Sequence, residues 1–185
     1  MTTNNDTLDG QLREMYGRAA YTHKTHEKMA DQSIAKYKWI KTVEIGLSAL
    51  SAGSFILAVF GDTPSGTITG ALLSTILLGF LLYFKEAKLG EQAQKHSVTA
   101  SKLWGVRERL LSVLVDLGRT GDGEVAAAHR DEINSELEAI YKAAPRTDLK
   151  AYAAAQNALK NQEELYFSDD ELNHLLPKQL RKVAQ

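Results

Sequence analysis

The chain has 185 residues, of which 24% are charged, and a net charge of −1. This balance supplies no basic surface, so no nucleic-acid partner is expected. The absence of cysteine excludes disulfides and cysteine-bound metals, and it fits soluble parts that face a reducing cytoplasm. The mean hydropathy of −0.27 is typical of a soluble protein, but the average conceals two long apolar runs.

Residues 1–41 are predicted to form a cytosolic amphipathic helix. Apolar or semi-apolar side chains recur mostly at alternating three- and four-residue spacing, which is the spacing of one helix face. The first long apolar run begins only after residue 40, too late for a cleavable signal peptide, so we expect it to remain as an anchor. The predicted face consists of Leu12, Met15, Ala19, His26, Ala30, Ser33, Tyr37 and Ile40.

Residues 42–85 are predicted to form a transmembrane hairpin. Ile45–Gly61 and Thr63–Phe84 contain 17 and 22 residues without a charge, and a hydrocarbon core of about 30 Å requires roughly 20 helical residues. Two adjacent helices that are apolar on every face would need a larger soluble protein to bury them. We therefore expect spans at about 43–60 and 66–84.

Lysines predict the orientation of the hairpin. Three lysines precede the first span, and Lys85 and Lys88 follow the second, whereas the turn between the spans has neither lysine nor arginine. By the positive-inside rule, both termini lie in the cytoplasm and the turn lies outside. Tyr37 and Trp39 fit the aromatic belt at the cytoplasmic surface.

Residues 86–117 are predicted to continue the second span into the cytosol without a break. Their apolar residues follow the four-three spacing of a coiled-coil seam. Because the helices of a tight hairpin are antiparallel, the first cytosolic helix is expected to pack along this seam. The seam consists of Leu89, Ala93, His96, Ala100, Leu103, Arg107, Leu110, Leu114 and Leu117.

Residues 118–185 are predicted to form shorter cytosolic helices. Gly118 is well placed to end the seam helix, and a second helix, with Val125 on its apolar face, is expected to end before Pro145. Thr147 or Asp148 can cap a third helix, whose predicted stripe consists of Leu149, Tyr152, Ala155, Leu159 and Glu163.

The last short helix has a clear start signal. In the sequence Ser-Asp-Asp-Glu at 168–171, the serine and the glutamate can form a capping box. No strand pattern is found. The predicted fold class is therefore all-α: a two-span transmembrane hairpin with long cytosolic helical extensions and a small C-terminal helical segment.

Residues along the cytosolic helices point to a known family. They are Trp104, Arg107, Leu110 and Leu111, then Ala144, Pro145, Ala151, Tyr152 and Glu163, and finally Phe167–Glu171 with Leu175, Leu176 and Pro177. Together with the two-span hairpin, this set resembles the SLATT domains over about residues 12–180. These are two-transmembrane effectors of bacterial anti-phage systems, associated with SMODS nucleotide-second-messenger synthases and SLOG sensor domains.

The resemblance implies a role and a location. It implies a protein of the bacterial inner membrane that permeabilises the bilayer when an infection is sensed, and so kills or arrests the cell. No sensor or enzyme domain is found in the sequence. The implied signal therefore comes from a separate sensor protein or from a nucleotide second messenger.

Four cytosolic residues are predicted to form a polar layer: His26, Glu27, His96 and Arg107. Counting the helical rise from the membrane places His96 opposite about Ala30, within a turn of His26 and Glu27. His96 and Arg107 occupy seam positions where leucine would be more stabilising. The layer either sets the register of the helices or acts as a coupling or pH-sensitive element.

Within the first span, Glu44, Ser48 and Ser51 share one helix face and Ser54 lies near it. Because intramembrane carboxylates usually face protein or water, these four residues are the candidate pore lining. In the alternative interpretation, Glu44 lies in the headgroup layer near Lys41, and the serines form hydrogen bonds within or between helices.

Within the second span, Gly66, Gly70 and Ser74 form a ridge of small residues. Such a ridge permits close helix packing, either within the hairpin or between subunits. Since two helices leave no lumen, a channel requires several copies, and a homo-oligomer is expected.

No catalytic, metal or cofactor site is predicted. His23, His26 and Glu27 do not have the order of a zinc-protease motif, and the glycine-rich residues 118–123 lack the ending and the preceding strand of a phosphate loop. We expect no enzyme. The favoured function is an oligomeric membrane effector, and the alternative is a membrane-tethered helical scaffold that recruits a cytosolic partner without conducting.

Overall fold

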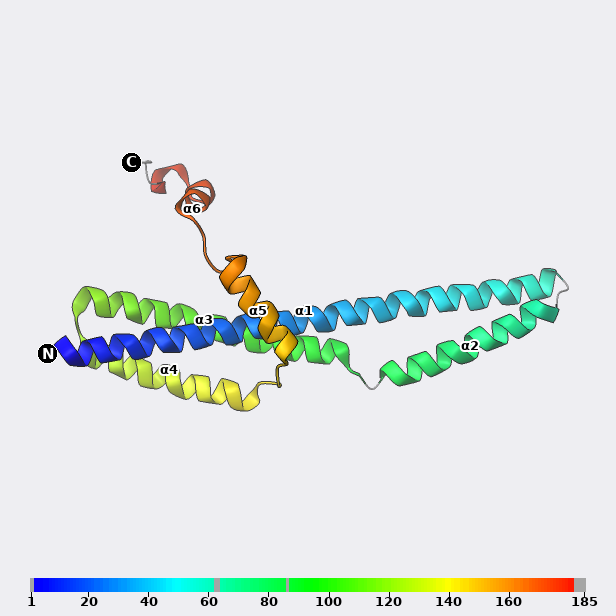
Figure 1. The fold of residues 1–185 in the computed structure, drawn as a ribbon, viewed down its shortest axis with the longest axis horizontal. Coiled ribbons are helices and arrows are strands. Elements are labelled where there is room, and N and C mark those ends of the chain that lie inside the picture. The colour runs from blue at the N-terminus through cyan, green and yellow to red at the C-terminus, as the bar shows by residue number, and fades with distance from the viewer. Residues whose placement is uncertain (1, 62–63, 86, 182–185) are drawn as a thin grey trace.

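One helix runs the length of the molecule. The computed structural model describes residues 2–61, 64–85 and 87–181, and helix α1 extends over Thr2–Phe60 (Figure 1). These 59 residues contain no proline to interrupt the backbone hydrogen bonds, and they would reach roughly 90 Å. The predicted passage of the first cytosolic helix into the first span without a break is confirmed.

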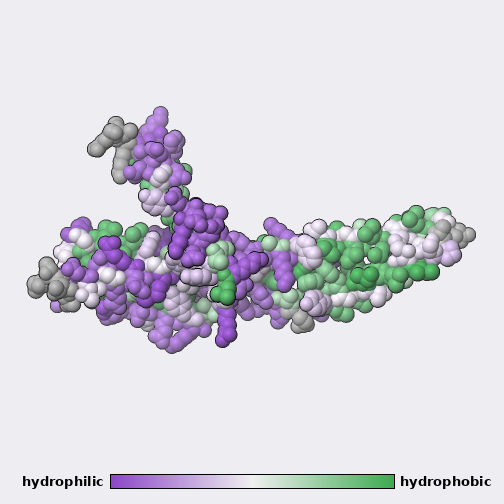
Figure 2. Space-filling model, in the orientation of Figure 1, coloured by the Kyte–Doolittle hydropathy of each residue, from purple (hydrophilic) through white to green (hydrophobic). Residues whose placement is uncertain are grey.

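The second span packs against the end of α1. Helix α2 (Pro64–Lys85) begins with proline, which costs nothing at the first helical position, and returns antiparallel to α1. In the most apolar window of each span only 6% of the residues are buried. Figure 2 shows this end of the molecule covered by hydrophobic residues. A helix in a soluble core would be buried, so these two helices have the surface of membrane spans, and the all-α two-span fold is confirmed.

The predicted unbroken passage from the second span into the seam is wrong. Helix α2 ends at Lys85 and α3 (Leu89–Thr120) begins at Leu89. Between them, Lys88 has a left-handed backbone with φ 42°. Figure 1 shows the result: α2 and α3 run in different directions and do not form one straight helix beside α1. The heptad spacing of the seam begins at Leu89, soon after the uncharged run ends at Phe84, so the sequence pattern alone does not indicate the turn.

Helix α3 ends later in the sequence than predicted. The helix continues past Gly118 to Thr120, and Gly121, with φ 68°, donates its amide hydrogen bond to the carbonyl of Leu117 at 2.9 Å. Both glycines could supply a left-handed C-terminus, but only Gly121 adopts it.

The helical bundle outside the spans consists of residues 2–41 of α1 together with α3, α4 (Gly123–Ala143) and α5 (Leu149–Asn161). Helices α3 and α4 both pack on α1, and the seam residues predicted in α3 are buried, except that Arg107 and Leu114 are partly buried. The predicted face of α1 is buried apart from Tyr37. The main core consists of Leu8, Leu12, Met15, Ala19, Leu103, Val106, Leu110, Val113, Leu117, Ala126, Ile133, Leu137 and Ile140.

Helix α5 crosses α1 and is capped by Asp148, whose carboxylate accepts the amide of Ala151 at 2.7 Å. Its buried face differs from the predicted stripe, since Leu149 is 86% exposed. Ala155 of the predicted stripe is buried, and the other buried residues of α5 are Ala151 and Ala158, which the stripe did not include.

The C-terminal segment lies apart from the bundle. Helix α6 (Asp169–Leu175) begins with the predicted capping box of Ser168 and Glu171, and a short 3₁₀ helix, η1 (Lys178–Leu180), follows. No residue of α6 is buried, and Figure 1 shows it projecting away from the other helices.

Candidate functional site

The inner face of the hairpin is joined by a serine pair. Ser51 of α1 lies 2.6 Å from Ser74 of α2, oxygen to oxygen, and donates a longer hydrogen bond to the carbonyl of Gly70 at 3.4 Å. Its residue is only 6% exposed. The hydroxyl of Ser51 is therefore hydrogen-bonded to the other helix of the same hairpin.

The small-residue ridge of α2 faces α1. A Cβ added at Gly66 would lie 3.0 Å from the amide nitrogen of Ala58 and 3.0 Å from the carbonyl oxygen of Ser54. At Gly70 the nearest atoms belong to the ring of Phe55, at 3.3 Å. Of the two packing arrangements expected for this ridge, the structure shows the one within the hairpin.

The four candidate pore residues do not form one exposed stripe. Glu44 forms an ion pair with Lys41 at 2.8 Å, and the Ser54 hydroxyl donates to the carbonyl of Leu50 at 2.9 Å. Ser48 is exposed, whereas Ser51 is buried. A single chain thus leaves Ser48 as the member of the set that is open to lipid or to a neighbouring subunit.

In the helical bundle, His26 of α1 and His96 of α3 meet at the depth expected from the sequence. Their Nδ1 atoms lie 2.8 Å apart and both residues are buried. A hydrogen bond between these atoms requires that one Nδ1 carries a proton and donates while the other is unprotonated and accepts. Burial, with the nearby His96 and His23, lowers the pKa of His26 to about 4. Burial also lowers the pKa of His96.

Glu27 and Arg107 do not join this histidine pair. The Glu27 carboxylate accepts from Lys24 at 2.7 Å and lies 3.3 Å from Nε2 of His23, while Arg107 donates to Glu108 at 2.6 Å. Burial lowers the pKa of His23 despite the nearby carboxylate. The predicted layer is therefore two adjacent groups, a neutral histidine pair and a charged cluster.

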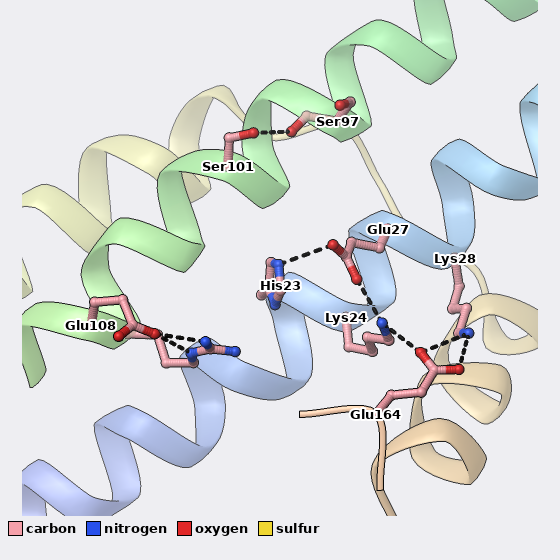
Figure 3. A network of polar contacts seen from close by, with 9 residues as sticks. His23, Lys24, Glu27, Lys28, Ser97, Ser101, Glu108 and Glu164 are labelled. Carbon is pink, nitrogen blue, oxygen red and sulfur yellow. Dashed lines mark hydrogen bonds and ion pairs between the residues drawn. The ribbon is translucent and has the colours of Figure 1, made fainter. Parts of the chain in front are cut away.

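The charged cluster continues to a residue that the sequence did not indicate. Glu164, after α5, contacts Lys24 at 2.5 Å and Lys28 at 2.9 Å, as Figure 3 shows. These two ammonium groups lower the pKa of Glu164. Glu163 next to it has a left-handed backbone, φ 51°, which turns the chain back toward α1. We name these three residues, Lys24, Lys28 and Glu164, the clasp.

A cleft of about 610 Å³ opens beside the clasp, between α1, α3 and the segment after α5. Trp104 and Ile34 lie in its walls. Among the residues that the structure describes, no group of three histidine or acidic side chains could hold a metal ion. The arrangement provides ion pairs and a solvent-open cleft.

Residues 8–171 match the model of the SMODS and SLOG-associating 2TM effector domain family 4. The chain belongs to this family. The resemblance to SLATT domains is thereby confirmed, and the match covers both the hairpin and the helical bundle. The family comprises two-transmembrane effector domains of anti-phage systems, and these domains are associated with SMODS and SLOG proteins. No curated protein and no solved structure matches the chain.

Proposed function

We propose that this SLATT protein is an oligomeric effector of the bacterial inner membrane that opens a pore or disrupts the bilayer when its cytosolic bundle receives a signal. The observation that carries the proposal is the continuity of α1, which packs against α3, α4 and α5 in the bundle and against α2 in the membrane. A rearrangement of the bundle would therefore move the first span directly.

In a single chain, the two spans expose apolar side chains and enclose no channel. The exposed fraction is 68% for Ile45, 75% for Val59 and 62% for Ile68. Because two helices enclose no lumen, conduction would require several hairpins. In the proposed mechanism, both termini lie in the cytoplasm, and a sensor protein or a nucleotide shifts the assembly by binding one arrangement more tightly than the other.

We keep Glu44, Ser48, Ser51 and Ser54 as candidate lining residues of the assembled pore. Ser48 is open to a neighbouring subunit in the present arrangement. Ser51 would line a pore only if its hydrogen bond to Ser74 were exchanged when the hairpins assemble. Ser48 is therefore the residue to test first.

Leakage from dye-loaded vesicles tests the proposal without knowledge of the natural signal. Since several chains must meet, leakage should rise more steeply than in proportion to the number of chains per vesicle. Ser48→Leu should reduce this leakage, and Ala49→Leu, at an adjacent exposed position, should leave it unchanged. Absence of leakage at every density, both for the chain alone and with each candidate nucleotide or sensor protein added, and with assembly confirmed by mass, would exclude a pore.

The second candidate function is a membrane-tethered scaffold, and one observation favours it. Helix α6 projects from the bundle, and Phe167 and Leu175 beside or within it are 55% and 72% exposed, as a docking segment for a cytosolic partner would be. A scaffold should give no leakage, should tolerate Ser48→Leu, and should lose partner recruitment when Leu175 is changed to Asp.

A further inference from the structure

The turn between α2 and α3 leaves a pocket of about 370 Å³ against α1, which we name the junction pocket. Three segments line it: the part of α1 just before the first span, the cytoplasmic end of α2, and the start of α3. An unbroken second helix would have continued along α1 at this level. The pocket is thus a direct consequence of the left-handed backbone at Lys88.

The polar side of the junction pocket is strongly basic. Its described lining contains Lys41, Lys85 and Lys88 and a single carboxylate, Glu44, which leaves a net charge of +2. Lys41 is held by Glu44 at 2.8 Å, whereas Lys85 and Lys88 form no ion pair with any described residue. The nearby Glu91 forms an ion pair with Lys95 at 2.7 Å, and its charge also interacts with that of Lys88. Among the described residues, no carboxylate forms an ion pair with Lys85 or Lys88, so their ammonium groups can bind an anion.

The opposite side of the pocket is apolar. Ile40 and Leu89 form part of its lining and are 7% and 9% exposed, and Leu81 and Phe84 of α2 extend the apolar lining toward the membrane. A soluble anion would make no use of this surface. A ligand that combines a negative headgroup with hydrocarbon would contact both sides.

The position of the pocket along the molecule matches the level where lipid headgroups meet acyl chains. The uncharged run of the second span ends at Phe84, and the pocket lies around this residue. Trp39 and Phe80, whose rings lie 6.4 Å apart, mark the same cytoplasmic boundary. Basic pockets beside spanning helices on the cytoplasmic side are typical sites for anionic lipid headgroups.

We infer that the junction pocket binds an anionic phospholipid, with its phosphate at Lys85 and Lys88 and its glycerol and upper acyl chain along Leu81 and Phe84. A free phosphate ion shares the headgroup chemistry, but the apolar lining and the membrane level favour the lipid. The site goes beyond the proposed function, since a lipid can bind here whether or not the assembly conducts. A lipid bound here would brace α2 and α3 against α1 at the turn.

Native mass spectrometry of the full chain, purified in mild detergent and given equal amounts of phosphatidylglycerol and phosphatidylcholine, tests the site. The wild type should retain phosphatidylglycerol preferentially. The double variant Lys85→Gln/Lys88→Gln should bind it about tenfold or more weakly, with phosphatidylcholine binding unchanged. Lys36→Gln/Lys38→Gln removes the same charge from exposed lysines outside the pocket and should bind like the wild type.

Two results would overturn the inference. If both double variants lost phosphatidylglycerol equally, or if neither did, the lysines of the pocket would have no special role. If inorganic phosphate at millimolar concentration displaced the lipid from the wild type, the site would be an anion site rather than a lipid site. A melting curve for each variant checks that the fold is retained, and leakage plays no part in the readout.

Discussion

At the residue scale, the burial of His26 and His96 against each other should make the helical bundle sensitive to acid. In the unfolded chain a histidine has a pKa near 6.5, whereas burial lowers the pKa of His26 to about 4 in the fold. Between these values the unfolded state binds a proton that the folded state does not. The free energy of unfolding should therefore fall, by on the order of 3 kcal/mol, as the pH drops from about 6.5 to about 4.

The melting temperature of the purified protein between about pH 7.5 and pH 4.5 measures this effect. His26 faces His96 on α3 and His23 on its own helix, and Asp148 lies close enough to His96 to oppose its pKa shift. The double variant His26→Leu/His96→Leu should weaken the acid dependence, because it removes two of the three buried histidine rings; His23, whose pKa burial also lowers, keeps a part of it. The variant His129→Gln, at an exposed position, should retain it. An unchanged acid dependence in the double variant would contradict the assignment.

Glycine packing in the hairpin gives a second prediction at this scale. Gly66→Ala places its Cβ against backbone atoms of α1 at 3.0 Å, and a backbone cannot yield without moving the helix. It should destabilise the hairpin by about 1–3 kcal/mol, as overpacking usually does. Gly70→Ala meets only the ring of Phe55, which can turn, so its cost should be smaller.

The midpoint of unfolding by dodecyl sulfate in mixed micelles would rank these variants. Gly79→Ala is the matched control in the same helix, because an added Cβ meets nothing within 4 Å there. It should unfold at or above the midpoint of the wild type, since alanine is the better helix former. If Gly79→Ala were as destabilising as Gly66→Ala, close packing on α1 would not explain the result.

At the element scale, the clasp fixes the segment after α5 to α1. Glu164→Gln removes the negative charge that pairs with both Lys24 and Lys28. The nearer of these two lysines, Lys28, is 136 residues away in the sequence. Because the carboxylate is partly exposed, the loss of stability should be small, roughly 0.5–1 kcal/mol. The local effect should be larger. Amide exchange and proteolysis should rise in residues 162–181 and stay unchanged in α3.

A control for the clasp lies next to it in the sequence. Glu163 is exposed and carries the same charge, so Glu163→Gln changes the net charge equally without touching either lysine contact. It should leave exchange in the C-terminal segment as in the wild type. Equal loosening by both variants would mean that overall charge, rather than the clasp, holds the segment.

The elements also show how far sequence patterns reach. Apolar runs, heptad spacing and the capping box at Ser168 depend on neighbouring residues, and these features predicted the hairpin, the buried seam and the start of α6 correctly. The depth of His96 followed from helical rise alone. In contrast, the turn at Lys88, the alanine face of α5 and the clasp at Glu164 depend on the directions in which helices meet. The spacing of apolar residues within one helix does not specify the direction in which that helix meets another.

At the scale of the whole molecule, α1 is the continuous connection between the bundle and the membrane, because the other connection turns at Lys88. Thr42→Pro should separate the two halves mechanically. Proline at this position removes the amide that bonds to residue 38 and clashes with its carbonyl, at a cost of about 3 kcal/mol in helix continuity. Thr42→Ala is the matched control, since it removes only the side-chain hydrogen bond to the Lys38 carbonyl.

Spin labels at Ala35 and Val59 would report the state of this rod, and the absence of native cysteine allows both labels to be placed cleanly. Their Cα atoms should lie roughly 36 Å apart in a straight helix. We expect one narrow distance distribution for the wild type and Thr42→Ala, and a broader, shorter one for Thr42→Pro. If α1 transmits the movement of the bundle to the spans, leakage should be lost in Thr42→Pro and retained in Thr42→Ala. Retained leakage with a kinked α1 would show that the spans assemble independently of the bundle, so the signal would have to act on the membrane segment itself.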